Sequence, residues 1–204
     1  LSFVFGMLPY VLWGGEFTLT NAWFESVSGY TTTGSTILND IEALPKSLLF
    51  WRSSTHFIGG LGVVVFLLLV LPQASPYRMK LTNMEMSSLS KEGYKYNSSK
   101  VIRIIVYVYI GLAVVSCISL WAAGMSLFDA VNHAFSIAAT GGFSTRNLSI
   151  GYYDSQLINT IVMALMAVGA MHFGLIYSVI VTGSLKPMNN AVVKYYFGSI
   201  ILCS

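Results

Sequence analysis

The chain has 204 residues, of which 55% are hydrophobic and only 9% are charged, and its mean hydropathy is +0.69. Soluble domains carry about 25% charged residues, so this composition excludes a soluble globular protein and predicts an integral membrane protein in contact with the lipid bilayer. The net charge of +3 is small and no arginine-rich stripe is present, so no nucleic-acid partner is expected.

The first third of the chain predicts a short helix between two apolar ones. Residues 1–13 are apolar but fall short of the about 20 residues that a membrane-spanning helix needs. We therefore expect them to be the end of an outer helix that begins upstream, in a longer polypeptide. Thr18 or Thr20 is suited to cap a short helix over residues 21–30. Residues 47–71 then predict a helix long enough to cross the bilayer.

The rest of the chain repeats this order after a polar connection. Residues 73–100 are rich in lysine and arginine, and such segments beside membrane helices usually face the cytoplasm. An amphipathic helix and a plain solvated linker both remain open for this connection. Further helices are expected over 101–123, from a cap at Ser126 to about residue 138, and over 157–182. The predicted all-α organisation is a first unit (1–71), a cytoplasmic connection (72–100), a second unit (101–182), and a cytoplasmic turn with the start of a third unit (183–204).

A run rich in glycine and threonine follows each short helix, at residues 26–36 and 136–145. Non-helical backbone at membrane depth is tolerated only where it is buried in protein or lines a wet cavity. Rings of backbone carbonyls form cation filters, and glycine reaches the positive φ values that turn a carbonyl toward an axis. An ordinary polar loop explains one such run equally well, but the repeat favours a filter. The residues predicted to bind the ion are Thr31, Thr32, Thr33, Gly34, Ala139, Thr140, Gly141 and Gly142.

The two runs align without a gap. Thr32 then falls over Thr140 and Gly34 over Gly142, whereas Gly141 replaces Thr33. This substitution predicts that the two filter segments are not equivalent around the pore.

Ionisable residues lie in or beside the predicted helices. Arg52 and His56 lie one turn apart near the outer end of the 47–71 helix, shallow enough to reach the interface. We favour a structural anchor over a role in the ion pathway for both. The Glu25 side chain either faces the vestibule of the predicted pore or forms hydrogen bonds with neighbouring backbone. His133, which aligns with Glu25, is expected to pack or to form hydrogen bonds, and Arg146 to make a surface contact near the mouth.

The run over residues 21–36 resembles the first pore loop of the Trk/Ktr/HKT superfamily of potassium transporters, and of its TrkH-like branch in particular. Further matches are Phe50-Trp51-Arg52, Gly59-Gly60-Leu61-Gly62 and the runs 123–130 and 141–145. The resemblance implies one polypeptide with four such units around one pore, of which this chain holds two. It also implies K+ as the transported ion, homodimers and a cytosolic nucleotide-binding regulatory subunit. In relatives that carry Na+ a serine can replace the first-loop glycine, so Gly34 favours K+.

We therefore expect the pore-forming subunit of a Trk-type system for K+ uptake across the inner (plasma) membrane, with its filter loops outside and no cofactor. The alternative is a secondary transporter of another cation such as Na+, or of a small solute, with broken helices. Such folds often contain inverted repeats, whereas both units here run in the same topology. An enzyme is not expected, because the histidines have no zinc-binding spacing and no Gly-x-Ser-x-Gly motif is present.

Overall fold

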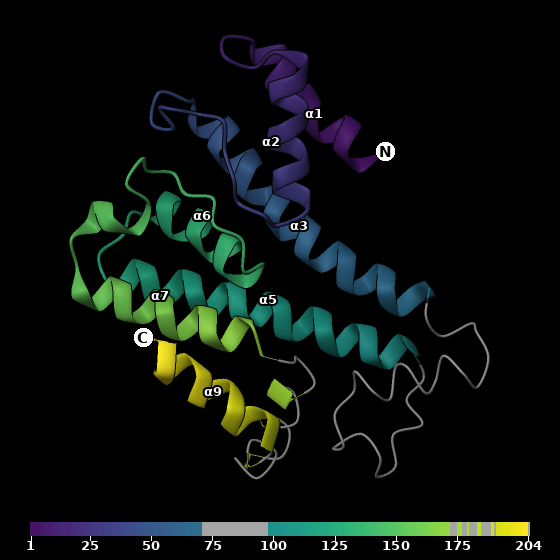
Figure 1. The fold of residues 1–204 in the computed structure, drawn as a ribbon, viewed down its shortest axis with the longest axis vertical. Helices are drawn as coiled ribbons and strands as arrows, with labels where there is room; N and C mark the ends of the chain where they lie inside the picture. Colours follow the sequence, from purple (N-terminus) through teal and green to yellow (C-terminus); the bar gives the residue numbers. More distant parts are fainter. Residues whose placement is uncertain are drawn as a thin grey trace. The chain divides into compact units, whose positions relative to one another are not determined.

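The computed structural model describes residues 1–70, 98–171, 175, 176, 179, 183, 184, 189 and 191–203, and every regular element in these ranges is a helix (Figure 1). The predicted cytoplasmic connection lies outside the described residues except for 98–100, which begin a helix. The elements are α1 (Ser2–Trp13), α2 (Leu19–Tyr30), α3 (Lys46–Val70), α5 (Ser98–Ala122), α6 (Leu127–Ala138), η3 (Ser149–Tyr153), α7 (Gln156–Gly169) and α9 (Ala191–Cys203).

The chain forms two compact units. One comprises Leu1–Val64 and Tyr109–Ala170, and the other comprises Val65–Val108 and Met171–Ser204. The first compact unit contains both short helices, α2 and α6, and both of the loops predicted to form a filter. All the contacts described below lie within it.

Within the described ranges, α5 carries the one segment that is long and apolar enough to cross a membrane. This segment is Ile105–Ala122, with a mean hydropathy of 2.1. The helices α1 and α7 are apolar but shorter. The helix predicted over residues 101–123 is thus present as α5, and its length suits a membrane span.

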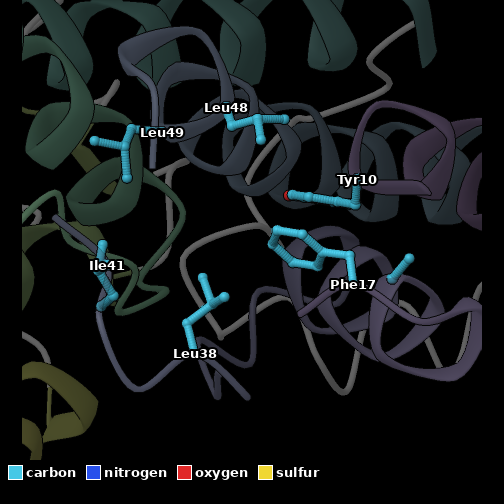
Figure 2. Close-up of a cluster of buried hydrophobic side chains, with 7 residues drawn as sticks. Tyr10, Phe17, Leu38, Ile41, Leu48 and Leu49 are labelled. Carbon is cyan, nitrogen blue, oxygen red and sulfur yellow. The ribbon is translucent and has the colours of Figure 1, made fainter. Parts of the chain in front are cut away.

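Two apolar clusters support the two repeats. The first consists of Tyr10, Phe17, Ala22, Leu38, Ile41, Leu48 and Leu49. Figure 2 shows Tyr10 of α1 facing Phe17, and the centroids of these rings are 5.0 Å apart. The second cluster consists of Leu120, Met125, Ala130, Ile137, Ile158 and Val162. In the gapless alignment Ala22 falls over Ala130 and Phe17 over Met125, so equivalent positions are buried in both clusters.

The prediction of one continuous helix over residues 157–182 is wrong. The helix α7 ends at Gly169, Ala170 caps it, and Met171 forms a bend. Glycine is a poor helix former, and a Cβ at Gly169 would lie 3.3 Å from the Ile137 carbonyl oxygen of α6. Because this stretch is predominantly apolar on both sides of Gly169, its hydropathy does not indicate the break.

Candidate functional site

The two short helices begin with the same cap. The Thr18 hydroxyl accepts a hydrogen bond from the Asn21 N–H (3.3 Å), and the Ser126 hydroxyl accepts one from the Asp129 N–H (3.1 Å). Ser126 also donates its hydroxyl hydrogen to Asp129 Oδ2 (2.9 Å). The predicted cap at Ser126 is confirmed, and of the two candidates for the first helix the cap is Thr18.

The two helices also end in the same backbone turn. Thr32 and Thr140 are both left-handed, with φ values of 56° and 48°, a conformation that is uncommon for residues other than glycine. After each of them an N–H reaches back to the helix, as in a Schellman cap. These bonds are Thr33 N–H to Ser28 O (3.0 Å) and Gly141 N–H to Ser136 O (2.8 Å). The repeat seen in the sequence is therefore a repeat of backbone conformation.

Beyond these turns the two loops meet at their glycines. Gly34 has a φ of +77°, and a Cβ built on it would lie 3.0 Å from both the Cα and the N of Gly142. The expected positive φ is thus present at Gly34. Gly142 lies outside the left-handed region, and a Cβ on it would be 3.7 Å from the Gly34 Cα, an ordinary contact. The close approach of the two backbones therefore constrains Gly34 more than Gly142.

Ser28 and Ser136, which the gapless alignment pairs but to which the sequence analysis gave no role, hold the loops to their helices. Ser28 donates its hydroxyl hydrogen to the Ser35 carbonyl (2.6 Å). Ser136 instead accepts a hydrogen bond from the Gly142 N–H (2.9 Å). Their equivalent place in both runs is a sequence signal of this shared role. The opposite direction of the two bonds makes the two loops locally different.

The hydroxyls of Thr31 and Thr33 in the first loop are bonded within their own surroundings. Thr31 donates its hydroxyl hydrogen to the Val27 carbonyl (2.7 Å), and the Thr31 and Thr33 hydroxyl oxygens are 2.8 Å apart. These bonds stabilise the end of α2.

A fully buried ion pair lies behind the first loop. The Nε and Nη2 atoms of Arg52 are each 2.8 Å from Glu25 Oε1, and the two side chains are 1% and 0% exposed. The expectation that Arg52 reaches the interface is wrong, because a carboxylate from α2 compensates its charge inside the protein. Of the two alternatives for Glu25, the structure contains the bonded one. Glu25 accepts hydrogen bonds from the Thr36 hydroxyl (2.8 Å) and the Ile37 N–H (3.3 Å).

Arg52 also reaches the second loop. Its Nη1 donates to the Ser144 carbonyl (3.3 Å), and its guanidinium lies 4.1 Å from the centroid of the Phe143 ring. His133 forms hydrogen bonds as expected, since its Nδ1 is 2.7 Å from the Asp129 carbonyl oxygen and its Nε2 is 3.0 Å from the Ser144 hydroxyl. One arginine on α3 therefore links the short helix of the first repeat to the loop of the second.

The segments that follow the two loops are joined at the surface. Asn147 accepts a hydrogen bond from the Ile41 N–H (2.6 Å) and donates one to Asp40 Oδ1 (2.9 Å). This side-chain hydrogen bond lowers the pKa of Asp40. Arg146 makes the expected surface contact, with ion pairs to Asp129 (3.0 Å) and Glu42 (3.4 Å).

Asp129 is the acid that ties the start of α6 to this surface cluster. Burial by itself would raise its pKa, but hydrogen bonds from Thr145, Ser126 and Arg146 outweigh burial and hold the pKa below its usual value. Asp129 thus stays ionised at neutral pH and ties the start of α6 to the end of the second loop at Thr145 and Arg146.

The arrangement suits a cation better than an anion. Two short helices end at the paired loops, and the C-terminus of a helix carries a partial negative charge. The loops are braced by buried polar side chains from α2, α3 and α6, so their backbone positions are fixed. Such fixed backbone is what a carbonyl-lined ion site needs.

A family model, curated proteins and a solved structure that are similar to this chain all belong to the same kind of cation transport protein. A family model described as a cation transport protein, TrkH, matches residues 6–203. The Trk system potassium uptake protein TrkH of Escherichia coli K12 is 34% identical over the whole of this chain, which spans 42% of that relative. The potassium uptake protein TrkG of the same strain is 38% identical over 88% of this chain and 37% of its own length. The crystal structure of the potassium transporter TrkH from Vibrio parahaemolyticus aligns with a TM-score of 0.68 at 33% identity, covering 84% of this chain and 34% of that one.

Proposed function

The chain belongs to the TrkH family of cation transport proteins, and on this basis we propose that it supplies two of the filter segments of a K+ uptake pore. It spans about two fifths of the length of the curated relatives that it matches. The complete pore then needs further segments of the same kind. The K+ pathway runs past the backbone carbonyls of Gly34 and Gly142 and those of the residues just before them.

One observation carries this proposal: the equivalent glycines of two loops with the same backbone turn lie against each other. Surface connections between helices can share a Schellman ending, but they have no physical reason to bring their equivalent glycines into contact. Filter segments have one, because each must offer carbonyls to the same ion at similar distances. The single key glycine in each loop is compatible with weaker discrimination against Na+ than in channels with longer filters.

The proposed orientation places the filter loops outside the inner membrane and residues 72–100 in the cytoplasm. The acidic side chains near the loops and the basic composition of residues 73–100 support it. The named relatives belong to a Trk uptake system, which supports K+ as the transported ion and further partners of the system. A homodimer and a cytosolic nucleotide-binding regulatory subunit are part of this proposal by family resemblance, and the proposal includes no cofactor and no enzymatic step.

The experiment is uptake of Rb+ or K+ by cells that lack their own K+ import, with Na+ as competitor. The intact protein is compared with Gly34→Ser and Gly142→Ser. We expect both variants to lose preference for K+ while membrane abundance is kept. Gly34→Ser has the larger effect, because its backbone is left-handed and its Cβ meets the second loop.

Gly151→Ser is the matched control. Gly151 is exposed on η3, it has no positive φ, and a Cβ there meets nothing within 4 Å. This control should keep the parental rate and ion preference. Unchanged selectivity in both loop variants would contradict the proposal and favour a transporter of another solute with broken helices.

A further inference from the structure

The imidazole of His56 occupies the space where the second loop lacks a side chain. His56 lies on α3 and is fully buried. A Cβ built on Gly141 would overlap the ring at Nδ1 and Cε1. Gly141 has no positive φ, so its backbone conformation does not require glycine. The ring from α3 is what excludes every larger residue at this position.

The same ring contacts two other parts of the loop. It stacks on Phe143, with centroids 4.1 Å apart and planes inclined by 5°. Its Nδ1 lies 3.4 Å from the hydroxyl of Ser136, the group that accepts the Gly142 N–H. The His56 ring therefore contacts the Gly141 backbone and the Phe143 ring, which lie on either side of Gly142 in the sequence. Through Ser136 it is also linked to Gly142 itself.

The first loop is built differently at the corresponding place. Thr33 occupies it, and the hydroxyl of Thr33 bonds to that of Thr31 within the same loop. In the second loop Gly141 has no side chain, and the His56 ring from α3 fills the corresponding space. This gives a physical reason for the difference between Thr33 and Gly141 that the sequence alignment contains.

We propose that His56 is a positioning residue for ion selectivity. Its planar ring packs against the second loop and sets the distance between the Gly141–Gly142 backbone and the first loop. The inference rests on the proposed cation pathway. His56 does not touch the ion. It acts through the loop backbone, because the carbonyls that replace the hydration shell of an ion lie on that backbone.

The test is a double-mutant cycle in the intact protein, with Rb+ uptake and Na+ competition as readouts. Gly141→Ala places a methyl group against the ring and should abolish most uptake. His56→Ala should keep uptake but lower the Rb+/Na+ preference about tenfold, which corresponds to about 1.4 kcal/mol. The double variant should recover Rb+ uptake, because His56→Ala removes the ring that the new methyl group of Gly141→Ala would overlap.

Ser54→Ala is the control, since Ser54 lies on the same helix and, among the described residues, its hydroxyl bonds only to the Phe50 carbonyl of α3. It should match the parent in rate and preference. An unchanged preference in His56→Ala, or parental behaviour of Gly141→Ala, would overturn the inference.

His56→Phe keeps the experiment decisive if His56→Ala fails to reach the membrane. It keeps a flat ring, so it should retain the parental preference, and Gly141→Ala should stay inactive in its presence. Recovery of Gly141→Ala by His56→Phe would refute the role of the ring. Absence of Rb+ uptake in the parent itself would refute the proposed function instead, so the two failures are distinguishable.

Discussion

The buried pair between Glu25 and Arg52 allows a quantitative prediction. Arg52→Met removes the guanidinium but keeps an unbranched apolar chain in place of the arginine stem, and it leaves the Glu25 carboxylate buried without its counter-charge. Both side chains are almost fully buried, and two nitrogens of Arg52 lie 2.8 Å from one carboxylate oxygen. Breaking one side of such a pair costs about 3–5 kcal/mol of unfolding free energy.

The double variant Glu25→Gln/Arg52→Met separates the orphaned charge from the lost contacts. Glutamine still accepts the hydrogen bond from Thr36, and neither side chain of the former pair carries a charge. Replacing both charges is often nearly neutral, so the double variant should be more stable than Arg52→Met by about 1–4 kcal/mol. The assay is equilibrium unfolding of the purified protein in mixed micelles of a mild detergent and dodecyl sulfate.

Glu42→Gln is the matched control for a surface pair. Glu42 is 37% exposed and lies 3.4 Å from Arg146, so its removal should cost no more than about 1 kcal/mol. If Arg52→Met cost no more than Glu42→Gln, the reasoning from burial would be refuted. The same result would follow from a double variant that is less stable than Arg52→Met.

Three further predictions concern the loops and their supports. Ser136→Ala removes the acceptor for the Gly142 N–H, so unfolding free energy should fall by about 0.5–1.5 kcal/mol and Na+ should compete better with Rb+ uptake; equal competition would contradict the role of this bond. The pKa of Asp129 is lowered in the folded protein, so its stabilising effect is complete above about pH 4 and is lost as the pH falls through the folded pKa. A stability–pH curve should therefore drop in that range for the parent and become flatter in Asp129→Asn, and curves of the same shape would exclude this acid as the cause. Gly59→Ala should destabilise the protein by about 1–3 kcal/mol in the same unfolding assay, because its Cβ would overlap the backbone at the end of α2, whereas Gly62→Ala, with open space around it, serves as the control and should change little.

Local features of the sequence determined the elements of the fold. The caps at Thr18 and Ser126, the short helices that follow, and the apolar α5 were readable because they depend on neighbouring residues. The repeat of glycine and threonine also identified where the chain leaves the helix. The identity of the transported ion and the expected number of units came from the family resemblance, because neither can be inferred from the pattern of neighbouring residues.

Only the tertiary structure decided how the two repeats support each other. Arg52 and His56 were readable as ionisable residues on one helix face, but not as buried groups that face two different loops. Their partners lie far away in the chain, and burial of a charge depends on whether a counter-charge from another element is present. For the same reason the role of Gly141 was hidden, since the side chain that requires a glycine there comes from a helix in the other repeat.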